Sequence, residues 1–74
     1  MAAKGQHVVP REGGWAVRSS GSARVSGRYA TQEEAIAAAV RIAKTKKTEV
    51  YIHGRDGLIR SRNSYGEDRF PAKG

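Results

Sequence analysis

The 74-residue sequence predicts an α+β fold, a single antiparallel β-sheet with one helix on one face, in the order β-β-β-α-β-β. Three observations predict it. Four short segments alternate apolar and polar residues with a period of two, which is typical of strands covered on one face. A longer central segment repeats its apolar residues at helical spacing. Glycine-containing turns separate neighbouring short segments, so these can pair as hairpins.

The first three strands are expected over residues 6–10, 15–19 and 24–29. Val8 and Val9 are the apolar part of the first strand. Pro10 has no N–H to donate to a ladder, which predicts that this strand lies at an edge of the sheet or ends there. Gly13-Gly14 and Ser20-Gly21-Ser22 supply the turns between the strands.

The helix begins after Thr31, because Thr31-Gln32-Glu33-Glu34 fits a capping box. Acidic residues in the first turn and lysines in the last turn both suit the helix dipole. One apolar stripe follows helical spacing, and a polar side opposes it. The stripe holds Ala35, Ile36, Ala39, Val40, Ile42 and Ala43, and the opposite side holds Glu33, Glu34, Ala37, Arg41 and Lys44.

Two more strands are expected over residues 48–53 and 58–62, joined by the turn Gly54-Arg55-Asp56-Gly57. This turn would place Ile52 opposite Ile59 and Tyr51 opposite Arg60, because directly opposed residues share a face. The position of each hairpin in the sheet stays open. We predict three parts along the chain: a flexible N-terminus (1–5), one α+β domain (6–63) and a mostly irregular tail (64–74), anchored by Tyr65 or Phe70.

The charge balance favours an anionic partner. Lys plus Arg number 14 against 7 for Asp plus Glu, a net charge of +7, which would attract nucleic acid or another anionic surface. The alternative is that the charge serves solubility or reflects a GC-rich genome. With no cysteine, disulfides, thiolate zinc sites and thiol nucleophiles are excluded. No signal peptide or membrane-length segment is found, so we expect a cytoplasmic protein without a membrane partner.

Strand parity, the alternation of successive side chains between the two faces of a strand, predicts the best candidate site. It places arginines from separate hairpins on the sheet face away from the helix. Guanidinium groups pair with phosphates or guanine edges, and the exposed Tyr51 could stack beside them. The alternative is a solvated polar face with weak ion pairs. The predicted nucleic-acid-binding residues are Arg18, Arg24, Arg28, Tyr51, Arg60 and Arg62, and the predicted inward residues are Val17, Val25, Tyr29, Val50, Ile52 and Ile59.

No catalytic, cofactor-binding or metal-binding residue is predicted, so the protein is expected not to be an enzyme. His7 and His53 lie far apart in the sequence and lack a convincing carboxylate partner. Trp15 and Tyr29 match the core parity, and Asp56 suits a tight turn. Lysines at the helix end suit the helix dipole as well as they would suit a phosphate.

Five motifs in order along the chain resemble one known family. They are His7-Val8-Val9-Pro10, Gly14-Trp15-Ala16-Val17, Thr31 with Glu34-Ala35, His53-Gly54-Arg55-Asp56-Gly57 followed by Ile59, and Ser64-Tyr65-Gly66. Together they resemble the short bacterial proteins of domain of unknown function 2188. The resemblance implies no activity, and it carries over no functional residue.

A looser likeness covers residues 24–43, with Gly27, Tyr29, Thr31 and Glu33-Glu34-Ala35. It is similar to the third strand and helix of plant AP2-type domains, which read the DNA major groove with a three-stranded sheet. The dense arginine cluster of that family's first strand is missing here, so the likeness is one of architecture. The sequence favours a small nucleic-acid-binding module for DNA or RNA. The competing hypothesis is a homodimer or protein adaptor that joins a partner through residues 6–10 or 65–71.

Overall fold

The computed structural model describes residues 5–22 and 24–65. Its six elements confirm the predicted fold class and order, with bounds that differ from the expected ones by one or two residues. They are β1 (Gln6–Arg11), β2 (Gly14–Ser19), β3 (Val25–Tyr29), α1 (Gln32–Lys46), β4 (Glu49–His53) and β5 (Ile59–Ser64).

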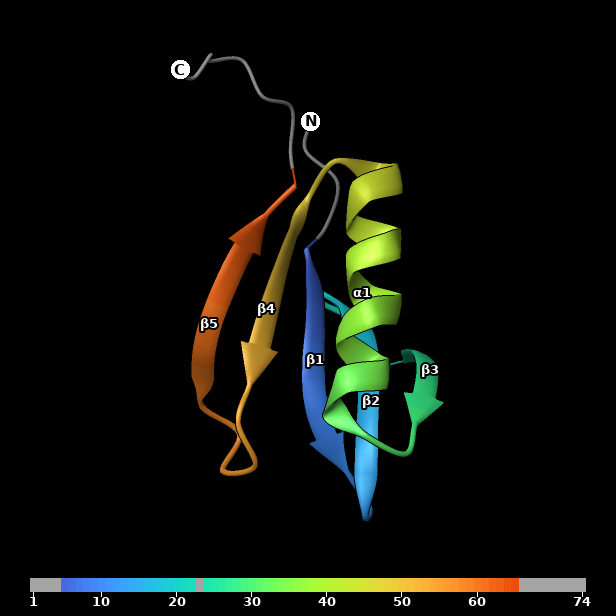
Figure 1. Cartoon of the computed structure of the whole chain (residues 1–74), viewed down its shortest axis with the longest axis vertical. Coiled ribbons are helices and arrows are strands. Elements are labelled where there is room, and N and C mark those ends of the chain that lie inside the picture. The colour runs from blue at the N-terminus through green and yellow to red at the C-terminus, as the bar shows by residue number, and fades with distance from the viewer. Residues whose placement is uncertain (1–4, 23, 66–74) are drawn as a thin grey trace.

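The sheet order is β3-β2-β1-β4-β5 (Figure 1), which settles where the two hairpins lie. Neighbouring strands are antiparallel except for β1 and β4, which are parallel. The sequence had predicted a wholly antiparallel sheet, and the parallel pair of β1 and β4 departs from that prediction. A parallel neighbour needs a long crossover connection, and α1 provides it by carrying the chain from one edge of the sheet to the far side of β1.

Of the two alternatives predicted for residues 6–10, the edge position is wrong, because β1 lies at the centre of the sheet between β2 and β4. The strand does end close to Pro10, at Arg11. Its pairing with β4 ends at Val8 and Ile52, while its pairing with β2 continues through Pro10 and Trp15. Pro10 therefore lies past the last residue pair with β4. A proline is tolerated there because no partner strand runs along that side.

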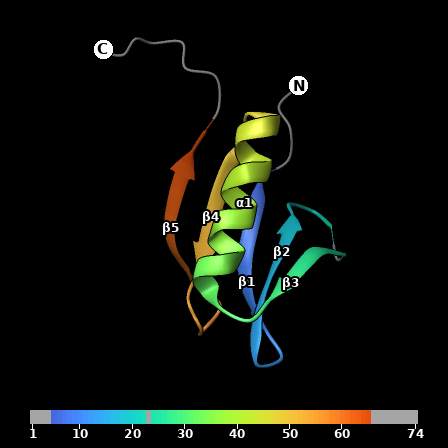
Figure 2. The same ribbon diagram turned by 45° about the vertical axis from the view of Figure 1, so that its right-hand side comes forward.

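The core lies between α1 and one face of the sheet (Figures 1 and 2). Alanines at successive turns of α1 are fully buried, and their small side chains let the helix lie close to the strands. Tyr29, Ile36, Val40, Ile42 and Ile52 pack around the centre of the core. The central cluster comprises Val8, Trp15, Val17, Ala35, Ala39, Ala43 and Val50.

Both ends of α1 are capped. The Thr31 hydroxyl accepts a hydrogen bond from the Glu34 backbone N–H at 3.1 Å, which confirms the predicted helix start. Lys47 adopts the left-handed conformation, with φ of 55°, and its N–H donates to the Ala43 carbonyl. All five residues predicted for the polar side of the helix are exposed.

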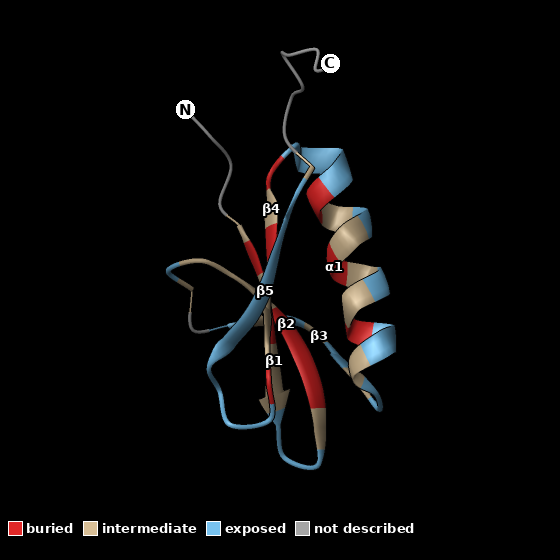
Figure 3. Ribbon diagram, turned by 60° about the vertical axis from the view of Figure 1, so that its left-hand side comes forward, coloured by how far each residue is buried: buried red, intermediate tan, exposed pale blue. Residues whose placement is uncertain are grey.

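The strand β5 differs most from expectation. A register shift between Ile52 and His53 pairs Ile59 with His53, and Tyr51 with Arg62 rather than Arg60. The prediction that Ile59 points inward is therefore wrong, and its side chain is 57% exposed. All of β5 is exposed (Figure 3), since α1 contacts β1 to β4 and not β5.

A second register shift, between Val17 and Arg18, places Val25 opposite Arg18. Val25 therefore does not share the face of Val17, as strand parity had predicted, and it is only half-buried. A bulge of this kind places an extra residue in one strand and changes which face the following side chains occupy.

Tyr65 anchors the end of β5 to the rest of the domain, as the sequence predicted. Its N–H donates to the Thr48 carbonyl at 3.0 Å, and its ring packs against the core. The Lys44 ammonium lies 5.8 Å from the ring centroid. Phe70, the other predicted anchor, lies outside the described residues. Within residues 5–22 and 24–65, no helix has the length and apolar character that a membrane span needs.

We predict that Val17→Ala lowers the free energy of unfolding by about 2–3 kcal/mol, because it removes two fully buried methyl groups and leaves a cavity. Ile59→Ala, at an exposed position, should cost about 0.5 kcal/mol or less. Denaturant unfolding of both variants measures the difference. Equal losses would contradict the placement of the core.

Candidate functional site

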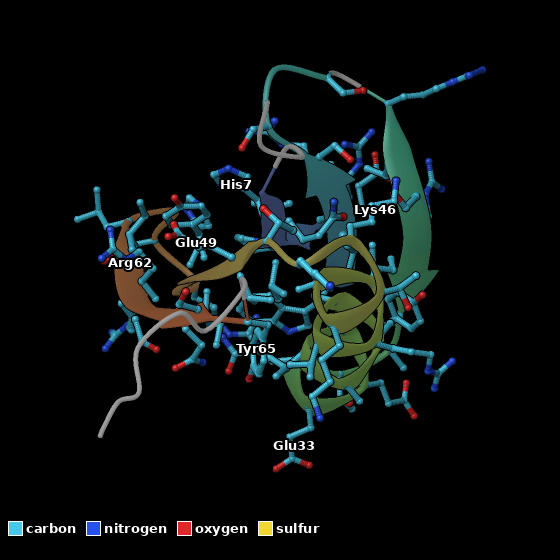
Figure 4. The ribbon with its side chains drawn as sticks, turned by 90° about the horizontal axis from the view of Figure 1, so that it is seen from above. His7, Glu33, Lys46, Glu49, Arg62 and Tyr65 are labelled. Atoms are coloured by element: carbon cyan, nitrogen blue, oxygen red, sulfur yellow. The ribbon has the colours of Figure 1, made fainter. Side chains whose placement is uncertain are left out.

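The sheet face away from α1 carries one continuous row of polar side chains. Backbone pairing places Arg62 opposite Tyr51, Tyr51 opposite His7, and His7 opposite Arg18. Directly opposed residues share a face, so these four residues form what we call the cross-strand row. Strands lie about 4.8 Å apart, so the row extends roughly 14 Å from β5 to β2. Figure 4 shows His7 on the opposite side of the sheet from Glu33 of the helix.

The row brings together three of the six residues predicted for nucleic-acid binding, Arg18, Tyr51 and Arg62. Arg28 also lies on this face, opposite Ala16 of β2, but nearer the other end of the strands. The side chains of Arg28 and Arg62 are exposed, whereas those of Arg18 and Tyr51 are half-buried. Strand parity thus located the face correctly, although Tyr51 is less exposed than expected.

The other two predicted residues lie elsewhere. Arg24 is exposed in the bend that precedes β3. Arg60 lies at the register shift in β5, and it lines a hollow with Trp15 and Thr31 on the helix side of the sheet. The bulge separates Arg60 from Arg62, although a regular strand would place both on one face.

Sequence reasoning missed a hydrogen-bonded pair of histidines at the centre of the face. The Nδ1 atom of His7 lies 2.9 Å from Nε2 of His53. The Nε2 atom of His7 lies 2.8 Å from the Ser20 hydroxyl, and Nδ1 of His53 lies 2.9 Å from the Gly57 carbonyl oxygen. Only the parallel pairing of β1 with β4 brings the two rings together, and the sequence left that pairing open.

Tyr51 links the histidines to the end of the row. Its ring stacks on the His7 ring, with centroids 4.8 Å apart and planes inclined by 21°. Its hydroxyl donates to a Glu49 carboxylate oxygen, and this bond raises the pKa of Tyr51 above its ordinary value, against the opposing effect of Arg62. The phenol therefore stays neutral at pH 7 and acts as a donor.

Two positively charged side chains flank this chain of polar contacts. Arg18 donates from Nη1 to the Ser22 carbonyl at 3.1 Å, which holds its guanidinium beside the turn that carries Ser20. Arg62 lies beside Tyr51 at the other end of the row. Among the described residues, neither arginine has a carboxylate as an ion-pair partner. Both charges are therefore available to an anionic ligand.

The His7 imidazole is held neutral. Burial lowers the pKa of His7 below 6.5, and the nearby charges of His53 and Arg18 lower it further. A neutral ring can accept a hydrogen bond, as the contact with Ser20 requires. Within the described part of the chain, no group of three or more His, Cys, Asp and Glu side chains could hold a metal ion.

We predict that the folded state loses stability as the pH falls below 6.5. The folded protein holds His7 at a lowered pKa, so the unfolded chain binds more protons in this range and acid favours unfolding. His7→Gln should flatten this part of the pH–stability curve, which urea unfolding between pH 8 and pH 5 measures. A variant curve parallel to that of the wild type would contradict the assignment.

Comparison with known proteins gives a family but no activity. One curated relative, an uncharacterized protein YdaT from Bacillus subtilis, is 41% identical over 63 residues. The aligned residues are 85% of this chain but only 42% of that protein, so the chain spans less than half the length of its relative. No solved structure matches the chain. Residues 6–65 match the model of a family described as uncharacterized proteins conserved in bacteria, so the chain belongs to the family DUF2188.

Proposed function

We propose that this domain binds nucleic acid through the sheet face opposite α1. The single observation that carries the proposal is the cross-strand row, which holds two arginines about 14 Å apart on a face that the helix leaves uncovered. The net charge of +7 supports it, since a positive field speeds encounter with a polyanion.

The chemistry of the row favours phosphate contacts over base stacking. Arginine donates to phosphate in a planar, two-pronged geometry. The rings of His7 and Tyr51 stack on each other, so the surfaces they share are closed to a base. A row that holds phosphates and offers few base contacts would bind with little sequence preference and with strong dependence on salt.

The same geometry favours a binding protein over an enzyme. The Ser20 hydroxyl does contact a neutral imidazole, which is one part of a nucleophile–base pair. Ser20 lines neither of two hollows in the molecule, one bordered by Arg11 and Trp15 and the other by Arg55 and Arg60. Ser20 lies in the turn after β2, outside these two hollows, whereas an enzyme needs a cleft that holds its substrate and excludes water.

We expect Arg18→Ala/Arg62→Ala to weaken binding to DNA or RNA by roughly tenfold or more, because it removes both charged contacts of the row. The slope of log affinity against log salt should fall by about 1–2. Fluorescence anisotropy with duplex and single-stranded oligonucleotides, each at two salt concentrations, measures both quantities.

The matched control is Arg41→Ala/Lys46→Ala, which removes the same charge from exposed positions on α1. This control should lose much less affinity than the variant of the row. Equal losses would show that net charge alone drives binding, and negligible wild-type binding at low salt would reject the proposal.

Pairing with a second protein is the competing function, and one observation favours it. The edge strand β5 is exposed along its whole length. It begins at Ile59, which is 57% exposed, and Leu58 just before it is 68% exposed. Such an edge can accept another strand. Self-pairing would bring Arg60 and Arg62 close to their copies, which opposes a homodimer. Light scattering at increasing protein concentration decides, because a constant monomer mass would reject self-association.

A further inference from the structure

We propose that His7 and His53 act as a single one-proton unit that binds a phosphate group at the centre of the cross-strand row. The inference rests on the proposed function and names the protonation state in which the site binds. It follows from the direction of the hydrogen bonds that join Ser20, His7, His53 and Gly57.

The neutral pair has only one arrangement of protons that satisfies every bond. The Gly57 carbonyl can only accept, so Nδ1 of His53 must carry a proton. In a neutral ring this leaves Nε2 of His53 as an acceptor, so the proton between the rings belongs to Nδ1 of His7. Then Nε2 of His7 is an acceptor, and the Ser20 hydroxyl must donate to it.

One further proton can bind the histidine pair without breaking any of these hydrogen bonds. It binds Nε2 of His7, which then donates to the Ser20 oxygen instead of accepting from it. The Ser20 hydroxyl hydrogen is released from the ring and becomes free to donate to a ligand. Proton uptake therefore supplies one positive charge and one hydroxyl donor on the same face.

A second proton would disrupt this series of hydrogen bonds. With both rings charged, N–H groups on Nδ1 of His7 and Nε2 of His53 would point at each other across 2.9 Å. Two positive charges at this distance also repel strongly. The pair therefore takes up one proton as a unit, as coupled groups do.

The charged groups around the pair set the pH at which that proton binds. Arg18 approaches the pair from β2, Glu49 and Tyr51 from β4, and Arg62 from β5. Asp56 and Arg55 lie in the turn before Gly57, and α1 covers the opposite face. In the free protein burial opposes charging of His7, and the charges of His53 and Arg18 add to this effect. A bound phosphate would offset Arg18 and thereby favour the charged pair.

The test is the pH dependence of binding of a single-stranded DNA oligonucleotide, measured at constant ionic strength. Affinity should rise by about fivefold or more between pH 7.5 and pH 5.5, at no more than about tenfold per pH unit, because one proton is linked to binding. The chain has only two histidines, so His7→Gln/His53→Gln should remove this dependence, and the affinities of the variant at pH 7.5 and pH 5.5 should agree.

Ser20→Ala tests the released hydroxyl. At pH 7.5 the Ser20 hydrogen is engaged by His7, so the variant should lose less affinity there than at pH 5.5. The loss of affinity at pH 5.5 should exceed the loss at pH 7.5 by about threefold or more, because the hydroxyl donates to the phosphate only after the proton has bound. Ser26→Ala, at an exposed position in β3, is the matched control and should change neither value.

Proton titration of the histidine ring signals by NMR separates this inference from the proposed function. The free protein should take up one proton across the pair, and a second only in stronger acid. No oligonucleotide binding at either pH would reject both the function and the phosphate role. Binding with an affinity independent of pH, or an equal loss from Ser20→Ala at both pH values, would reject this inference alone.

Discussion

Close packing of the alanine-lined helix against β1, β2 and β4 fixes both the core and the face of the sheet that stays open. Ala35, Ala39 and Ala43 are fully buried, and they meet valines from these three strands. A helix 15 residues long covers only part of a five-stranded sheet. It closes one face and leaves the other open, and β5 extends beyond its reach.

The open face owes its chemistry to the crossover that the helix makes. Because α1 carries the chain past β2 and β1, β4 lies parallel to β1 and places His53 and Tyr51 beside His7. A simple meander would have paired β4 with β3 instead. The polar chain through the two histidines and the flanking arginines is thus a consequence of the same packing that forms the core.

The two bulges decide which arginines share a surface. The shift in β5 keeps Arg62 beside Tyr51 and places Arg60 on the helix side, while the shift between β2 and β3 aligns Val25 with Arg18. Local pattern could not predict either shift, because each depends on how two strands pair rather than on one strand alone. These shifts explain why the alternation along each strand placed Arg18, Tyr51 and Arg62 on the open face correctly and misplaced Val25 and Ile59.

By itself, the sequence determined the six elements, the helix cap at Thr31 and the core positions of Trp15, Val17 and Val50. These features follow from local periodicity and capping chemistry, which neighbouring residues specify. Tertiary structure alone decided the central place of β1, the parallel neighbour β4 and the contact of His7 with His53. The two histidines lie 46 positions apart in the sequence, and the pairing of such distant strands is set by how the helix closes the core.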